Sequence, residues 1–227
     1  MPGYGQFCPV AKASEVFAER WTPLIMREIL LGSSHFNELE RGLPRISRSV
    51  LAQRLKSLER DGLIERHASD NGRATTYLPT AAGRELFDVI HQLGVWGARW
   101  MNRDVRDEDI DVDLLLWDMH RRINLDQLPA RRVVVQFQFT GISSKRLWLV
   151  LLPTEVAVCV TDPGFDIDVY VTADTMTLHR VWLGHHSFSS ALASRAIQLD
   201  GPSDLVRQFP GWFQLSMFSH VSPVAAD

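Results

Sequence analysis

The sequence predicts an α+β protein of two domains, the first made of helices closed by a hairpin and the second built on a mainly antiparallel sheet. Three observations predict this class. Apolar residues recur at helical spacing through much of the first hundred residues, whereas they alternate with polar ones over 133–140. A length of 227 residues is enough for two domains that each bury a core. We expect the domains at 1–103 and 114–227, joined by an acidic linker at 104–113.

Four helices are expected in the first sixty residues. Ser14–Leu31 divides into two helices near Trp21, because Pro23 suits the first turn of a helix rather than its interior. Phe36–Arg41 predicts a short third helix, and Ser47 caps a fourth. A short helix, a tight turn and a capped helix follow one another in the order of a helix-turn-helix.

A β-hairpin and a long helix are expected next. Leu63–His67 and Thr75–Leu78 are typical of strands and flank a stretch rich in turn residues, which predicts a β-hairpin. A helix from Thr80 to Met101 carries an apolar stripe that is too long for one small domain to cover. The stripe predicts a homodimer interface, and its members are Leu86, Ile90, Leu93, Trp96 and Trp100.

Residues 114–227 predict a second α+β domain. The alternation in Val133–Thr140 is typical of a strand that is buried on one face. Further strands are expected at Leu147–Leu152, Val156–Val160 and Asp168–Thr172, and helices at Leu114–Arg122, Ala173–Leu183 and Ser203–Phe209. This mixture of elements gives the α+β class with a mainly antiparallel sheet.

Composition and motifs argue against several classes of protein. The two cysteines lie far apart, which argues against a disulfide framework and a zinc site. Because there is no run of eighteen apolar residues and no signal-peptide pattern, we expect a cytoplasmic protein with no membrane partner. Neither an enzyme nor a cofactor is expected, since phosphate-binding glycine loops and nucleophile elbows are absent. His179, His185 and His186 lack an acidic ligand at matching spacing, so we predict no metal site.

A basic, outward-facing helix predicts double-stranded DNA as a partner. Residues 41–66 contain seven basic residues against three acidic ones. If the leucines of the fourth helix are buried, its polar side chains lie on the opposite face. There Ser49 and Gln53 suit base edges, and the flanking arginines suit phosphates. The predicted DNA-binding residues are Arg45, Ser47, Arg48, Ser49, Gln53, Arg54, Lys56, Arg60, Arg66 and Arg73.

A specific set of motifs spans Cys8 to Trp100 in order. It comprises Cys8-Pro9-Val10, Trp21 to Leu30, Phe36 to Leu39, Ile46-Ser47, Leu51 to Ile64 and Tyr77 to Gly83. Together these motifs resemble the HxlR family of bacterial transcriptional regulators. The resemblance implies a dimeric winged helix that binds operator DNA, with Ser47–Lys56 as the recognition segment and Arg66–Tyr77 as the wing. Residues 70–73 depart from the pair of prolines that wings of this family often carry.

Cys8 stands where several members of that family use a cysteine to sense oxidants or electrophiles. The resemblance therefore implies a redox-sensing role for Cys8. Lys12, one helical turn later, would favour a thiolate at this position. The alternative is a small apolar side chain that only packs.

The second half carries a sparser set of motifs. They are Trp148 to Val150, Asp162-Pro163-Gly164, Val171 to Asp174, Arg180 to Gly184, Asp200-Gly201-Pro202 and Phe209-Pro210. They resemble a sterol-carrier-type domain, which implies a five-stranded sheet flanked by helices around a tunnel for an apolar small molecule. The predicted lining is Trp117, Phe137, Phe139, Trp148 and Trp182. The alternative is that these aromatic residues simply fill a core.

These features predict a homodimeric transcriptional regulator whose operator binding responds to an apolar small molecule. The alternative is a lipid-binding or carrier protein that uses its winged helix for dimerisation or protein contacts. The polar outward face of the fourth helix favours the regulator, because a helix that binds protein would expose apolar residues.

Overall fold

The computed structural model describes residues 3–68, 74–101 and 105–224. The chain divides into two compact units, an N-terminal unit of residues 1–94 and a C-terminal unit of residues 95–227. The division falls inside a single helix, α5 (Ala81–Trp100). None of the described helices is long and apolar enough to cross a membrane.

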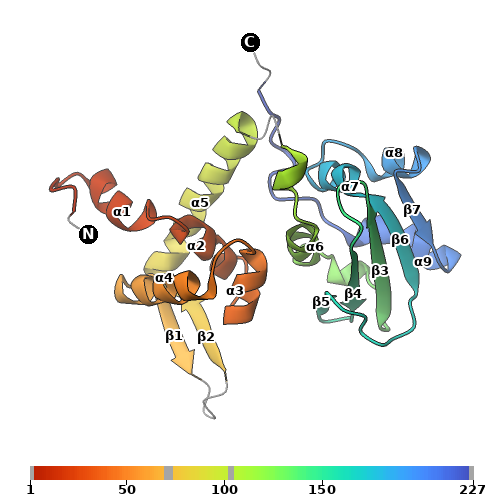
Figure 1. The fold of residues 1–227 in the computed structure, drawn as a ribbon, viewed down its shortest axis with the longest axis horizontal. Coiled ribbons are helices and arrows are strands. Elements are labelled where there is room, and N and C mark those ends of the chain that lie inside the picture. The colour runs from red at the N-terminus through yellow and green to blue at the C-terminus, as the bar shows by residue number, and fades with distance from the viewer. Residues whose placement is uncertain (1–2, 69–73, 102–104, 225–227) are drawn as a thin grey trace. The chain divides into compact units, whose positions relative to one another are not determined.

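The N-terminal unit has the elements that the sequence predicts. They are α1 (Pro9–Phe17), α2 (Thr22–Leu30), α3 (Phe36–Gly42), α4 (Arg48–Arg60), the antiparallel hairpin β1 (Ile64–Ala68) and β2 (Thr75–Pro79), and the start of α5 (Figure 1). The first helix begins at Pro9, earlier than expected, because proline also suits the first turn there. The predicted helices of the helix-turn-helix and the predicted strands of the hairpin are therefore confirmed.

One apolar core holds the helices and the hairpin of this unit together. Its buried members are Ile25, Met26, Ile29, Leu39, Leu43, Ile46, Leu51, Leu55, Leu58 and Ile64. Leu86 and Ile90 of α5 pack against this core. Both were predicted to lie in a dimer interface; they are half-buried against the core of their own unit, and their place in that interface stays a prediction. Only Leu93, Trp96 and Trp100 of the predicted set are exposed.

The C-terminal unit contains a five-stranded sheet and short helices. Its elements are η1 (Asp107–Asp109), α6 (Val112–His120), η2 (Leu125–Gln127), β3 (Val133–Thr140), β4 (Arg146–Leu151), β5 (Val156–Cys159), β6 (Val169–Asp174), α7 (Thr175–Trp182), α8 (Phe188–Ala193), β7 (Ile197–Asp200), α9 (Ser203–Gln208) and η3 (Phe209–Trp212). The predicted linker at 104–113 thus includes η1 and the start of α6, where the Asp111 carboxylate caps the helix. The sequence did not predict α8 and β7, which are too short to show a period.

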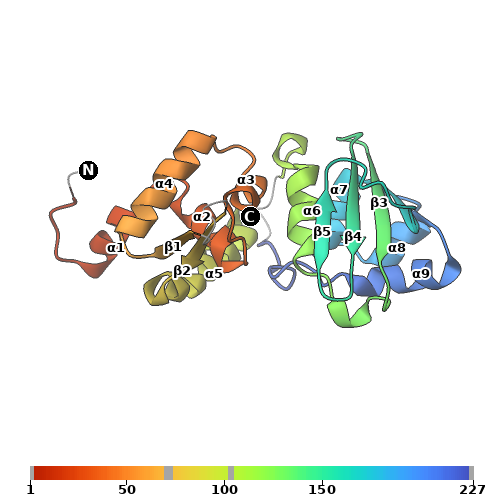
Figure 2. The same ribbon diagram turned by 90° about the horizontal axis from the view of Figure 1, so that it is seen from below.

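The strand order of the sheet is β5-β4-β3-β6-β7. Three of its pairings are antiparallel, but the central strands β3 and β6 pair in parallel. The sheet is therefore mixed, and the prediction of a mainly antiparallel sheet did not include the parallel pair. The alternation of apolar residues shows which face of a strand is buried, but it does not show whether the neighbouring strand is parallel or antiparallel. Helices α7 and α8 lie behind the sheet in Figure 2.

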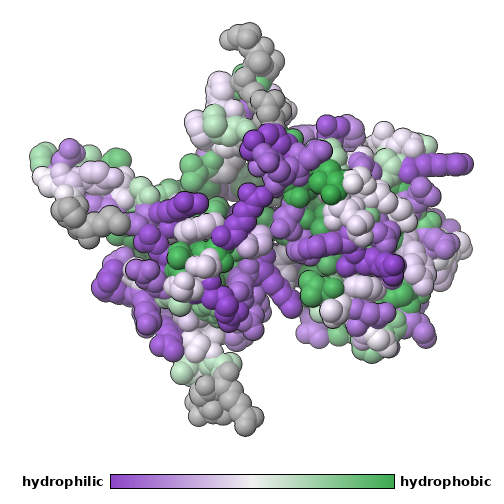
Figure 3. All heavy atoms as spheres, viewed as in Figure 1, coloured by the Kyte–Doolittle hydropathy of each residue, from purple (hydrophilic) through white to green (hydrophobic). Residues whose placement is uncertain are grey.

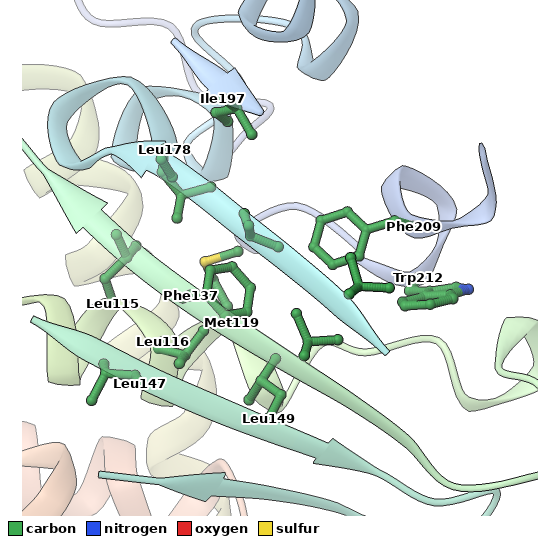
Figure 4. Packing of buried hydrophobic residues seen from close by; sticks show 14 of the residues in the cluster. Leu115, Leu116, Met119, Phe137, Leu147, Leu149, Leu178, Ile197, Phe209 and Trp212 are labelled. Carbon is green, nitrogen blue, oxygen red and sulfur yellow. The ribbon is translucent and has the colours of Figure 1, made fainter. Parts of the chain in front are cut away.

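The core of the C-terminal unit is aromatic. Phe137 packs with Phe139 and Phe209, with ring centroids 6.0 and 6.2 Å apart, and Met119 of α6 belongs to the same cluster (Figure 4). Burying such rings contributes strongly to stability. Figure 4 also shows Trp212 at the end of the cluster near Phe209.

The aromatic residues that were predicted to line a tunnel are part of the packing. Trp117, Phe137, Phe139 and Trp182 are buried members of the core cluster. Trp148 is also buried, but it alternates with Leu147 and Leu149 and so lies on the other face of the sheet. A surface cleft of about 500 Å³ lies elsewhere, at α8, β7 and α9, and none of the five lines it. These residues pack as the alternative interpretation expects, and a tunnel lined by them stays a prediction.

Candidate nucleic-acid interface

Helix α4 presents its polar side chains to solvent. The Ser47 hydroxyl accepts a hydrogen bond from the backbone N–H of Val50 at 3.3 Å and caps the helix. The leucines of α4 are buried in the core, and the opposite face is exposed. That exposed face carries Ser49, Gln53, Lys56 and Arg60, as the spacing predicts. Hydrophilic side chains gather over α3 and α4 in Figure 3.

A buried ion pair fixes the turn that precedes this helix. The Glu28 carboxylate is fully buried, and Arg27 Nε and Nη2 donate to its Oε1 at 3.1 and 2.7 Å. Arg27 Nη2 also donates to the carbonyl oxygen of Gly42 at 3.2 Å, which joins α2 to the end of α3. A buried carboxylate is tolerated only when it is paired and hydrogen-bonded in this way. Sequence reasoning missed the network, although a charged pair inside an apolar run is a signal for it.

The hairpin is attached to the turn between α2 and α3. The backbone N–H of Tyr77 donates to the carbonyl oxygen of Ser34 at 2.8 Å, and His35 forms a β-bridge with Thr76. The Thr80 hydroxyl donates to the carbonyl oxygen of Gly62 at 2.7 Å, which joins the end of the hairpin to the end of α4. The hairpin and α4 are therefore held in one framework (Figure 1).

Several predicted phosphate-binding arginines already have a carboxylate partner. Arg54 Nη1 lies 2.7 Å from Glu19 Oε2, and each of these side chains is about three-quarters buried, with exposed fractions of 25% and 22%. This ion pair holds α4 to the segment between α1 and α2 and gives Arg54 a role inside the fold, while its contact with DNA stays a prediction. Arg48 pairs with Glu40 and lies over the Phe36 ring but remains exposed.

The other predicted DNA-binding residues are on the surface. Lys56 and Arg66 are exposed and have no ion pair among the described residues. Arg45 is exposed just before α4, and Arg60 lies 3.5 Å from Asp61 at the end of that helix. Arg73 lies outside the residues that the structure describes.

The candidate metal-binding histidines and the candidate redox-sensing cysteine lie outside the predicted DNA-binding segment of the sequence. His179 lies in α7, where burial, followed by the positive charges of His185 and Arg180, lowers the pKa of its imidazole. Among the described residues, no group of three histidine, cysteine or acidic side chains is arranged to hold a metal ion. Cys8 is half-buried at the start of α1, and the Lys12 ammonium lies 3.2 Å from the Glu15 carboxylate.

Comparison with known proteins gives the family. The model of the HxlR-like helix-turn-helix family matches residues 16–105. YvaP of Bacillus subtilis, an uncharacterized HTH-type transcriptional regulator, is 32% identical over 104 residues, which are 45% of this chain and 96% of YvaP. The HTH-type regulator Rv3095 of Mycobacterium tuberculosis is 42% identical over 96 residues, and the match spans 41% of this chain and 60% of Rv3095.

Two of the solved structures that are similar to this chain each cover less than half of it. The putative transcription factor PA1607 is 28% identical and covers 47% of this chain and 73% of its own, with a TM-score of 0.41. The redox regulator HypR in its oxidized form is 31% identical and covers 43% of this chain and all of its own, with a TM-score of 0.39. On the family model and its curated relatives, the chain belongs, through its first hundred or so residues, to the HxlR-like helix-turn-helix family of transcriptional regulators.

Proposed function

We propose that the protein is a homodimeric regulator that reads operator DNA by placing α4 in the major groove. The observation that carries this proposal is the exposed polar face of α4 on a framework that holds the hairpin beside it. Helix-turn-helix proteins use the N-terminal part of such a helix to contact base edges. Membership of a family of DNA-binding regulators supports the same function.

We propose that some of the exposed residues of α4 and its surroundings contact base edges and that others contact phosphate groups. Ser49 and Gln53 are suited to base edges, because their side chains both donate and accept hydrogen bonds. Phosphate contacts are proposed for the backbone N–H groups after Ser47 and for Arg45, Arg48, Lys56 and Arg60. Arg66, and Arg73 outside the described residues, are proposed to contact DNA from the wing.

The dimer interface is proposed along the exposed stripe of α5. Val89, Leu93, Trp96 and Trp100 are 48%, 48%, 52% and 42% exposed in the single chain. Steps of three and four residues place them on one side of the helix, next to the side that packs on the core. A contiguous apolar surface with two tryptophans is typical of an interface.

Other parts of the interpretation remain proposals. We place the protein in the cytoplasm, with DNA binding and dimerisation in residues 1–103 and a separate sterol-carrier-like domain in 114–227. A five-stranded sheet with helices agrees with that resemblance, but the packed aromatic residues do not support a tunnel among them. A lipid-binding or carrier protein is the second candidate, and it is tested by measuring whether the purified protein contains an apolar compound.

Redox sensing by Cys8 is a further proposal. It is tested by measuring the operator affinity of the Cys8→Ser variant in the presence of an oxidant.

Replacing Gln53 with Ala is expected to reduce discrimination between operator and random duplex by about 1–3 kcal/mol, the value of one good base contact. The operator is first obtained by footprinting the purified protein on its own genome. Fluorescence anisotropy on both duplexes then gives the two affinities. Equal losses on both duplexes would remove Gln53 from base recognition.

Arg54 and Lys56 are expected to behave differently although both are basic residues of α4. Lys56→Gln should weaken binding to every duplex and lower the slope of log affinity against log salt by about 1, because one phosphate contact is lost. Arg54→Gln should leave that slope unchanged, since its guanidinium is paired with Glu19, and should lower thermal stability instead. A salt slope that falls equally in both variants would contradict this assignment.

A further inference from the structure

A cleft of about 500 Å³ in the C-terminal unit is bordered by α8, β7 and α9 (Figure 1). Its volume lies within the range of pockets that hold small-molecule ligands. Four half-buried apolar residues line it, namely Leu192, Leu199, Val206 and Pro210. Ile197 of β7 also borders the cleft but is fully buried, so a ligand there would be recognised by side chains and not by the backbone of this strand.

Two cationic side chains, those of Arg195 and Arg207, line the same cleft. Both are exposed, and neither forms an ion pair or a side-chain hydrogen bond within the described part of the chain. Asp204 lies one turn before Arg207 in α9, but the two residues do not form an ion pair. Both guanidinium groups are therefore available to an anionic ligand.

The backbone of Arg195 adopts a conformation that favours glycine. Its φ is 59°, and it follows Ser194, the C-cap of α8, at the position where helices commonly end on a left-handed glycine. The Arg195 N–H donates to the carbonyl oxygen of Leu192 at 3.1 Å, and Gln198 Nε2 donates to the carbonyl oxygen of Arg195 at 3.3 Å. Any side chain at this φ has a steric cost that glycine avoids. A ligand-binding role for the Arg195 side chain accounts for an arginine at this position.

We propose that this cleft binds an amphiphilic organic anion, which is a carboxylate or phosphate group attached to an apolar chain. Arg195 and Arg207 would bind the anionic group through charge-assisted hydrogen bonds, because a guanidinium can donate to two oxygens of a carboxylate or phosphate at once. The apolar chain would lie against Leu192, Leu199 and Val206, where it is removed from water. A neutral lipid would leave both cations without a partner, and an inorganic anion would leave the apolar walls in water. The two features together therefore favour an amphiphile.

The test is isothermal titration calorimetry of the full-length protein with decanoate in the absence of DNA, so its result does not depend on the proposed operator binding. We expect decanoate and decyl phosphate to bind at a single site in each chain. Decanol, the neutral ligand with the same chain length, should bind about tenfold more weakly or worse, because the charge-assisted hydrogen bonds are lost. Hexanoate, which has a shorter chain, should also bind about tenfold more weakly or worse, because less apolar surface is buried. Equal affinities for decanoate and decanol, or for decanoate and hexanoate, would overturn the proposal.

Arg195→Gly separates the loss of the cation from a loss of structure. Glycine adopts the positive φ freely, so the melting temperature should stay near that of the wild type. The Kd for decanoate should rise about tenfold or more in this variant and in Arg207→Gln, because each removes one guanidinium. Arg146→Gln removes a positive charge at an exposed residue that does not line the cleft, and it should leave the Kd near that of the wild type.

Two further outcomes would overturn the proposal. One is an unchanged Kd for decanoate in both Arg195→Gly and Arg207→Gln. The other is binding to phosphatidylglycerol vesicles that requires both arginines and comes without binding of decanoate, because the arginines would then contact a membrane surface and not a single amphiphile in the cleft.

Discussion

Replacing Leu93 with Asp is expected to convert the protein into monomers and to lower operator affinity about a hundredfold or more. Leu93 lies within the exposed apolar stripe of α5 and is 48% exposed in the single chain. In a twofold-symmetric interface the new carboxylate would be buried twice without a partner, at a cost of several kcal/mol. A monomer would then contact one half-site where the dimer contacts two.

Sedimentation velocity and operator titration measure the two effects. Leu78→Asp is the matched control for the oligomeric state, because Leu78 has a similar exposure of 44% but lies in β2, outside the apolar stripe of α5. That control should remain a dimer. A Leu93→Asp protein that sediments as a dimer at micromolar concentration would place the interface on another surface.

Replacing Gly42 with Ala is expected to destabilise the N-terminal unit by about 3 kcal/mol, close to the effect of breaking a buried ion pair. A methyl group built on Gly42 would lie 1.8 Å from Glu28 Oε2. The carboxylate is fully buried and held by Arg27, so it can move aside only by giving up that contact. The turn before α4 would then lose its support, and DNA binding should fall with stability.

Urea denaturation followed by circular dichroism measures this loss. Asn37→Ala, an exposed change in the same helix, is the control and should alter stability by less than about 0.5 kcal/mol. Combining Gly42→Ala with Glu28→Ala should cost less than the sum of the single changes, because the second removes the group that the methyl meets. Additive effects would refute the steric explanation.

Local signals in the sequence were sufficient for the N-terminal elements and for the direction of α4. Ser47 marks the start of α4, and its leucines recur at helical spacing, so both the helix and its exposed face follow from neighbouring residues. Contacts over long sequence distances could not be predicted in this way. The pairing of Arg54 with Glu19 and of Arg27 with Gly42 depends on how the helices pack, which periodicity does not encode.

In the C-terminal unit, too, contacts between residues far apart in the sequence could not be predicted from local patterns. Alternation located β3, but its parallel neighbour β6 comes after β4 and β5, and no local pattern indicates that return. The same pattern showed that Phe137 and Phe139 face inward without telling a packed core from a cavity wall. The Arg195–Arg207 cleft was missed because it is built around β7, a strand of four residues.

The continuity of α5 sets a rule for dividing this protein into fragments. A cut at the boundary of the compact units, after Gly94, would leave the helix without Trp96 and Trp100 and expose a new carboxyl terminus beside Leu93. A fragment that ends at residue 103 keeps the whole helix. We therefore expect the longer fragment to purify as a DNA-binding dimer and the shorter one to be monomeric, although both retain the helix-turn-helix.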